Sequence, residues 1–227
     1  MPVAFQPFSG FRPEAIQFLA DLAANNERTW FQPRKAEYER LLKAPLEALC
    51  EALAERFEAK GIPLLADPAR SPFRIYRDVR FSKDKSPYKT NVGASFPWAG
   101  DGEGAGGGYF HLAPGEVFVG GGMWHPEPAR LNAFRRLVDT DPGRVHAVID
   151  DPAFVRTFGR VSGEALTRVP QGYRGDHPDA DLLKLKGVVF MRQLSDADAA
   201  SPDLPDSLAE TLERGLPLLR LLASLPA

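Results

Sequence analysis

The spacing of apolar residues changes near residue 73, and this change is the strongest constraint on the fold. Before it, apolar residues recur every three or four positions, the period of a helix buried along one side. After it, apolar and polar residues alternate, as in a strand with one buried face. Helices, then strands, then more helices predict an α+β fold, with N-terminal helices packed on a mainly antiparallel β-sheet and further helices after it.

The helical part is expected to cover residues 12–60. Pro45 either starts a new helix or kinks the preceding one, because proline lacks the backbone donor that a helix interior needs. The apolar stripe beyond it runs to Gly61, a residue type that commonly ends helices. Cys50 lies on that stripe, so we interpret it as a core residue and not as a nucleophile.

Glycine and proline mark the connections of the predicted sheet. Ala113-Pro114-Gly115 has the composition of a hairpin turn, and the glycine-rich stretch at residues 100–108 that of a flexible loop. Gly120-Gly121-Gly122 is interpreted as the end of a strand. These glycines either form a bulge or tight turn into the next helix or let the backbone approach a ligand closely. The predicted strands are residues 74–80, 92–98, 109–112, 116–119 and 187–193, and later helices are expected at 128–138, at 144–149 and after a capping box at Ser207 and Glu210.

Composition limits the class of protein and its surroundings. Hydrophobic residues make up 44% and charged residues 26% of the 227 residues, which indicates a soluble globular protein, long enough for one large domain or two small ones. The net charge of −2 gives no overall attraction to nucleic acid or membrane, and no apolar run approaches a bilayer span. One cysteine and no visible secretory signal predict a cytoplasmic location, and the oligomeric state stays open.

Positive charge is concentrated in one short segment. Residues 70–89 contain seven lysines and arginines against two aspartates, in a chain that is slightly acidic overall. Aromatic residues and prolines interrupt these charges, which favours a folded surface over a disordered tail. Arginine presents a planar pair of donors to phosphate or carboxylate, so this segment predicts binding of a small anionic ligand.

An extended segment at 74–80 would place alternate side chains on one face, followed by a lysine-rich loop. Asp78 and His125 are the candidates for an acid or base if catalysis occurs. The candidate ligand-binding residues are Arg74, Tyr76, Arg77, Arg80, Lys83, Lys85, Tyr88, Lys89 and Trp124.

Two other functions remain open for the same segment. Basic residues with interleaved aromatics suit single-stranded nucleic acid, through phosphate contacts and base stacking. Alternatively, the domain is structural or binds another protein, and its arginines pair with helix carboxylates such as Glu37, Glu39 and Glu51.

Other familiar sites lack their defining patterns. The glycines at 100–108 lead into a predicted strand and no Gly-Lys-Ser/Thr follows, which argues against a phosphate-binding loop. Asp176, His177 and Asp179 could ligate a divalent cation, but their sequence is also that of a turn and helix N-cap. We therefore expect no metal and no cofactor.

Four stretches together resemble one protein family. They are NNERTWFQPRKAEYE at 25–39, RIYRDVRFSKDKSPYKTNVG at 74–93, YFHLAPGEVFVGGGMWHP at 109–126 and GYRGDHPDADLLKLKG at 172–187. These motifs are similar to those of the DUF2461 family and occur in the same order over residues 5–223, with the glycine loop as a local addition. The resemblance implies a single domain over residues 1–227 and supplies no activity or catalytic residue, because the family has no established function.

Overall fold

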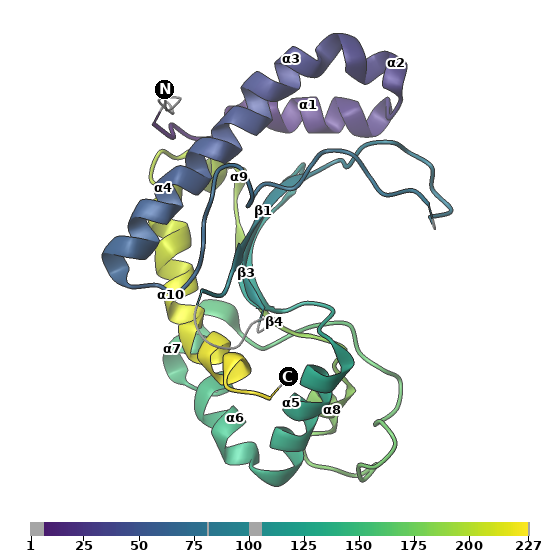
Figure 1. Cartoon of the computed structure of the whole chain (residues 1–227), viewed down its shortest axis with the longest axis vertical. Coiled ribbons are helices and arrows are strands. Elements are labelled where there is room, and N and C mark those ends of the chain that lie inside the picture. Colours follow the sequence, from purple (N-terminus) through teal and green to yellow (C-terminus); the bar gives the residue numbers. More distant parts are fainter. Residues whose placement is uncertain (1–6, 81, 100–105, 227) are drawn as a thin grey trace.

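The structure is a computed structural model of the chain that describes residues 7–80, 82–99 and 106–226. Its centre is a four-stranded antiparallel sheet whose strands neighbour one another in chain order. Helices precede and follow this sheet, so the predicted α+β fold is confirmed (Figure 1). The strands are β1 (Val92–Pro97), β2 (Gly107–Ala113), β3 (Glu116–Met123) and β4 (Val188–Leu194).

The N-terminal helices confirm the prediction for residues 12–60. Pro45 lies in the first turn of α4, directly after a π-helical turn, so α4 starts there without a break in the helical path. Gly61 ends α4 in the left-handed conformation, with φ of 61°. Cys50 is fully buried, and burial raises the pKa of its thiol to about 12. The helices are α1 (Pro13–Ala24), α2 (Arg28–Phe31), α3 (Lys35–Tyr38) and α4 (Ala44–Lys60), with a 3-10 turn at Gln32–Arg34 and the π-helical turn at Glu39–Lys43.

Three helices between β3 and β4 begin with proline, whose fixed φ suits a first helical position. The capping box predicted at Ser207 and Glu210 is wrong, because the last helix already begins at Leu204. A capping box instead opens α9, where Ser195 and Asp198 accept each other's backbone N–H. The later helices are α5 (Pro128–Thr140), α6 (Pro142–Ile149), α7 (Pro152–Phe158), α8 (Ala180–Lys184), α9 (Asp196–Ala200) and α10 (Leu204–Ala223).

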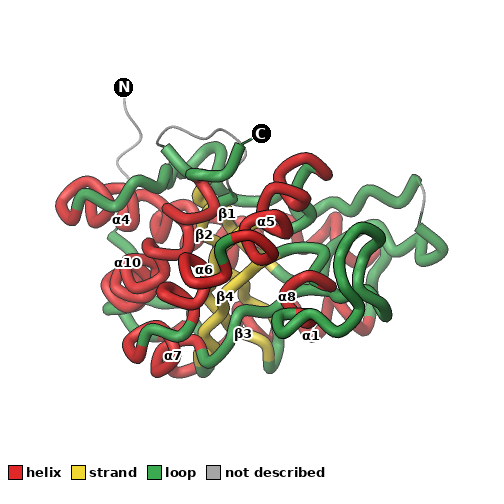
Figure 2. The backbone as a smooth tube through the Cα atoms, turned by 90° about the horizontal axis from the view of Figure 1, so that it is seen from below, coloured by secondary structure: helices red, strands yellow, loops and turns green. Residues whose placement is uncertain are grey.

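The two faces of the sheet are covered differently. Helices α4 and α10 lie against one face, where Phe96 and Phe110 are fully buried (Figure 1). The other face is concave, with α1 to α3 above it and α5 and α8 below it in Figure 1, and Figure 2 shows α10 and α8 on opposite sides of the strands. Alternate residues share a face, so Tyr109, His111 and Phe118 lie on the concave face, where they are only partly buried.

Phe190 of β4 lies where α10 packs on the sheet. A Cβ atom added to Gly215 of α10 would overlap this ring, and one added to Gly121 of β3 would lie 2.7 Å from it. Phe154 and Phe158 of α7 contact the same ring, with centroid distances of 6.1 and 4.6 Å. The ring is therefore confined by two glycines and two phenylalanines.

The glycine segments differ from their predictions. Gly120, Gly121 and Gly122 are paired residues within β3, which continues to Met123, and not a bulge or turn after the strand. A Cβ atom at Gly120 or Gly122 would clash with the backbone of β4, so the lack of side chains lets the two strands pair. Residues 100–105 of the expected flexible loop lie outside the described residues, whereas Gly107 and Gly108 are paired residues of β2. Within the described part of the chain, no helix has the length and apolarity needed to cross a bilayer.

Candidate functional site

Residues 74–80 and 82–90 form the basic arm, which extends away from the sheet in Figure 1. The arm starts next to β1, where the N–H of Phe73 donates to the carbonyl of Gly93 over 2.9 Å. Among the described residues of the arm, its two halves pair through one bridge, Tyr76 with Tyr88. The predicted regular strand at 74–80 is therefore wrong, because only a few backbone hydrogen bonds hold this segment extended.

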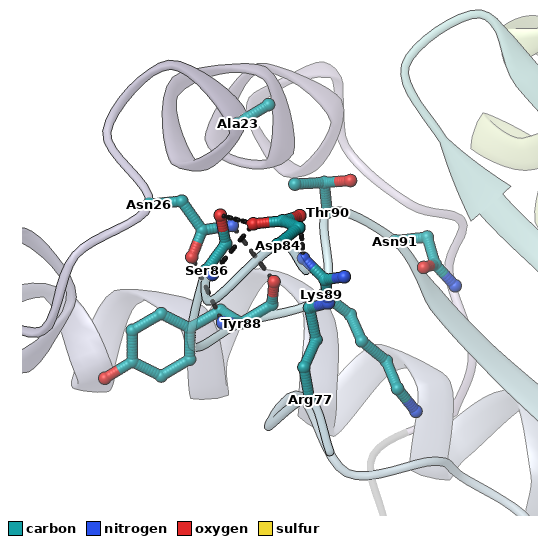
Figure 3. A pocket seen from close by; sticks show the side chains of 9 residues that line it. All are labelled: Ala23, Asn26, Arg77, Asp84, Ser86, Tyr88, Lys89, Thr90 and Asn91. Atoms are coloured by element: carbon teal, nitrogen blue, oxygen red, sulfur yellow. Dashed lines mark hydrogen bonds and ion pairs between the residues drawn. The ribbon is translucent and has the colours of Figure 1, made fainter. Parts of the chain in front are cut away.

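Tyr88 and Asn26 anchor the base of the basic arm to the helices. The Tyr88 ring is fully buried and stacks on Phe31 of α2 with centroids 4.1 Å apart. The Asn26 side chain donates to the Tyr88 carbonyl over 3.0 Å and accepts from its N–H over 3.1 Å (Figure 3). The Tyr88 ring points away from the other side chains of Figure 3, so it acts as an anchor and not as a wall for a ligand.

Two arginines of the basic arm pair with aspartates of the same arm. Arg77 bonds Asp84, and Arg80 bonds Asp78 with Nη2 to Oδ2 at 2.7 Å. Hydrogen bonds from these arginines hold the pKa of both carboxyls below the usual range. Asp78 is thus a weak base in this arrangement, with its carboxylate occupied by Arg80.

Two adjacent hollows lie at the base of the basic arm, with volumes of about 410 and 390 Å³. Three side chains line both of them: Arg77, Lys89 and Asn91. The first hollow is also lined by Ala23, Asn26, Asp84, Ser86, Tyr88 and Thr90, and the second by Phe73, Asp78 and Tyr109. The second hollow therefore reaches from the arm to the concave face of the sheet.

Lys89 differs from the paired arginines of the arm. Its Nζ lies 4.9 Å from the centre of the Phe73 ring, over the face of that ring. Burial lowers the pKa of Lys89, and the neighbouring positive charge of Arg74 lowers it further. Among the described residues no carboxylate lies within ion-pairing distance of this ammonium group, and Figure 3 shows the side chain extending away from the Arg77–Asp84 pair. Lys89 is a partly desolvated cation beside both hollows.

Tyr109 belongs to this site although sequence analysis did not select it. Its hydroxyl lies 3.0 Å from Nδ1 of His111, the next residue on the same face of β2. Gly93 of β1 makes room for this hydroxyl, since a Cβ there would lie only 2.7 Å from it. The alternation of YFHL does place these two polar side chains on one face, but no local signal shows that Tyr109 lines a hollow at the base of the basic arm.

Trp124 and His125 lie away from the two hollows. They follow the last residue of β3, about four residues beyond the partner of Tyr109, which corresponds to about 14 Å along a strand. Trp124 is 62% exposed, and His125 has an unusual φ of 48°. These two residues do not line either hollow at the base of the arm.

The remaining candidates lie on the exposed surface of the arm and line neither hollow. Lys85 donates to the carbonyl of Val79 over 2.9 Å, and Arg80 bonds Asp78. The alternative prediction paired these arginines with helix glutamates, but Arg77 and Arg80 bond aspartates of the arm. Glu39, one of the expected partners, lies 3.7 Å from Lys35 instead. The outward-facing set is Arg74, Tyr76, Arg80, Lys83 and Lys85.

The acidic cluster near residue 176 is divided among separate partners. Asp176 bonds Arg174 at 2.9 Å, whereas Asp179 bonds Nε2 of His146 at 2.8 Å. Nδ1 of His177 accepts the backbone N–H of Asp179 over 2.9 Å, as in a turn. In the ranges that the structure describes, no group of three or more His, Cys, Asp or Glu side chains could hold a metal ion.

The His146 pair with Asp150 and Asp179 gives a pH-dependent prediction. Hydrogen bonds from the imidazole to these carboxylates raise the pKa of His146 above its ordinary value. A raised pKa in the folded state stabilises the protein below the unfolded-state value of about 6.5, and this contribution is lost as pH rises through the folded value. We expect an NMR titration to give a His146 pKa above 6.5 that returns toward it in Asp150→Asn. An unshifted pKa in the parent protein would contradict the pair. The stability effect is expected to be only tenths of a kcal/mol, because the imidazole is exposed.

Comparison with known proteins identifies the family of this chain but indicates no activity. Neither the curated proteins nor the solved structures include a match to this chain. The model of a family described as "Conserved hypothetical protein (DUF2461)" matches residues 14–220, which is most of the chain. The resemblance to this family is therefore confirmed: the chain belongs to the DUF2461 family.

Proposed function

We propose that this protein binds a small anionic ligand, bearing phosphate or carboxylate, at the base of the basic arm. The observation that carries the proposal is Lys89, a partly desolvated ammonium group with no carboxylate partner among the described residues, beside two hollows. An anion in either hollow would supply the missing counter-charge. Partial removal from water strengthens such an interaction relative to one on an open surface.

The other groups around Lys89 suit the same ligand. Arg77 lines both hollows and can share its guanidinium between Asp84 and a bound anion. Asn91, Ser86 and Thr90 add amide and hydroxyl donors. Volumes near 400 Å³ match the lower end of the range of small-molecule sites. The site proposed here is smaller than the set predicted from sequence, with Arg77 and Lys89 at its centre.

Calorimetric titration with sulfate, phosphate and succinate at low salt tests the proposal. Lys89→Met keeps the length of the side chain and removes its charge, and we expect it to weaken anion binding about tenfold, or about 1.4 kcal/mol. Lys83→Met is the matched control, since Lys83 is an exposed lysine of the same arm that lines neither hollow. Equal weakening by both substitutions would indicate general attraction to a basic surface, and binding of none of the three anions by the parent protein would reject the proposal.

Binding of single-stranded nucleic acid is the second candidate, favoured by two exposed rings. Phe73 is 44% and Tyr76 45% exposed, and cationic side chains lie next to them on the arm. Stacking of a base on such a ring contributes about 1–3 kcal/mol. Fluorescence anisotropy of a labelled oligo(dT) strand would show binding that weakens in Tyr76→Ala and in rising salt. No anisotropy change at low salt would exclude this function.

The compartment is part of the proposal as well. Cys50, the single cysteine of the sequence, is buried and has a raised thiol pKa, so it is protected from oxidation and metal binding. A chain with this cysteine usage needs no oxidising environment to fold, which supports the cytoplasm as its location.

A further inference from the structure

Tyr109 and His111 form a hydrogen-bonded pair on the concave face of the sheet, beside the second hollow. Tyr109 lines that hollow, and its hydroxyl lies 3.0 Å from Nδ1 of His111. The His111 ring stacks on Phe118 of β3 with centroids 4.7 Å apart and planes 7° from parallel. This stacking holds the imidazole in place, so Nδ1 stays directed at the hydroxyl group.

The far side of the imidazole has no matching partner. Nε2 of His111 is buried and makes no hydrogen bond to any described residue. Among the described residues, the acidic group within ion-pairing distance is Glu116, whose carboxylate oxygen lies 3.9 Å away, too far for a hydrogen bond but close enough for charge attraction. A hydrogen on Nε2 faces this carboxylate favourably, whereas a lone pair there would be repelled by it.

Whether Nδ1 also carries a hydrogen determines what Tyr109 presents to the hollow. In neutral His111 with the hydrogen on Nε2, Nδ1 can only accept a hydrogen bond. The Tyr109 hydroxyl then donates its hydrogen to Nδ1, and only its oxygen lone pairs face the hollow. In protonated His111, Nδ1 donates to the hydroxyl oxygen, and the Tyr109 hydrogen is free to point into the hollow. Only the second arrangement offers a hydrogen-bond donor to an anion while keeping a hydrogen opposite Glu116.

The charged groups around the pair favour different states. Burial lowers the pKa of His111, with Glu116 of β3 opposing this change, so the imidazole is mainly neutral near pH 7 without ligand. From the arm, Arg77, Lys89 and Asp78 line the same hollow as Tyr109. The β1 residue opposite His111, Gly93, and the β4 residue opposite Phe118, Gln193, carry no titratable group. A bound anion adds negative charge on the hollow side and shifts the balance toward imidazolium.

We propose that Tyr109 donates a hydrogen bond to the anion held by Lys89, and that binding is coupled to protonation of His111. The proton comes from solvent and adds to Nδ1, the imidazole nitrogen that carries no hydrogen in the neutral form, and no covalent bond to the ligand forms or breaks. Tyr109 is the contacting residue, and His111 is the positioning residue that orients its hydroxyl. The inference rests on the proposed anion site and adds two residues of the sheet to it.

Sulfate is the appropriate probe, because it carries the same charge over the whole neutral range and cannot itself exchange protons. Calorimetric titration in two buffers of different ionisation enthalpy, near pH 7.5, measures the protons taken up per sulfate bound. The parent protein is expected to take up a fraction of a proton, and NMR is expected to show the His111 pKa rising by about one unit with saturating sulfate. Coupling is reciprocal, so sulfate binding should tighten as pH falls.

Two conservative variants separate the roles of the pair. Tyr109→Phe keeps the ring and removes the hydroxyl, and we expect about fivefold weaker sulfate binding with little proton uptake. His111→Gln keeps a hydrogen-bonding side chain that cannot titrate, and it should abolish the uptake while sulfate still binds. Far-UV circular dichroism and thermal unfolding check that both variants are folded.

The outcomes distinguish this inference from the proposed function. Sulfate binding that depends on Lys89 but involves no proton uptake, with an unchanged His111 pKa, would overturn the coupling and leave the anion site standing. Uptake that persists in His111→Gln would assign the proton to another group and overturn the inference equally. Absence of sulfate binding to the parent protein would overturn the site for tetrahedral anions together with the inference.

Discussion

Replacing Gly215 by alanine is expected to lower the free energy of unfolding by about 2 kcal/mol, even though alanine is the better helix former. An added Cβ overlaps the Phe190 ring, which is 1% exposed and is confined by Phe154 and Phe158. Overpacking a close-packed core costs about 1–3 kcal/mol or more. The gain in helix propensity of about 1 kcal/mol offsets only part of this cost. Urea denaturation monitored by circular dichroism measures the difference.

Gly143→Ala is the matched control for that prediction. Gly143 is also a helical glycine, in the first turn of α6, and the nearest atom to an added Cβ is 3.7 Å away. The same substitution is expected to raise the free energy of unfolding there by about 0.5 kcal/mol, through helix propensity alone. Equal effects at the two positions would mean that the contact of α10 with Phe190 is looser than described.

Arg135→Met is expected to destabilise the protein by about 3 kcal/mol. Arg135 is 8% exposed, and its guanidinium donates to the carbonyls of Leu183 and Leu185, each over 2.9 Å. These carbonyls lie at the end of α8, where a helix has no acceptor partners of its own. Methionine fills a similar length but donates nothing, so two hydrogen bonds from a charged group are lost.

Arg136→Met controls for the loss of charge and length on the same helix. Arg136 is exposed, and its substitution is expected to change the free energy of unfolding by less than about 0.5 kcal/mol. Thermal and urea unfolding of the two variants in parallel measure the contrast. A similar small effect of both substitutions would show that the carbonyls at the end of α8 find other partners.

Local spacing in the sequence predicted most of the fold. The helical stripe around Cys50 and the hairpin at Ala113-Pro114-Gly115 are both present, because a period of 3.6 or 2 residues reports directly which side of an element is buried. Predictions of where a helix begins, which depend on only four residues, were less successful. Ser207 and Glu210 have the spacing of a capping box, but α10 had already begun three residues earlier.

The candidate site was located only in part. The basic segment was recognised from its charge, and Arg77 and Lys89 do line hollows at its base. Tyr109 was missed, because a tyrosine on an alternating strand has no feature that distinguishes a ligand contact from ordinary sheet packing. Trp124 was selected for its position after three glycines, but it lies beyond the end of β3, away from the arm.

The sequence by itself determined the order of the main helices and of the four strands of the sheet, the basic character of residues 70–89 and the family, since all three depend on neighbours in the chain. The tertiary structure alone decided which charges are occupied. Arg77 and Arg80 pair with aspartates a few residues away, whereas Arg135 donates to carbonyls about 50 residues away. Lys89 has no carboxylate partner among the described residues. Charge pairing depends on distances of a few ångströms between segments, and a linear pattern carries no such distances.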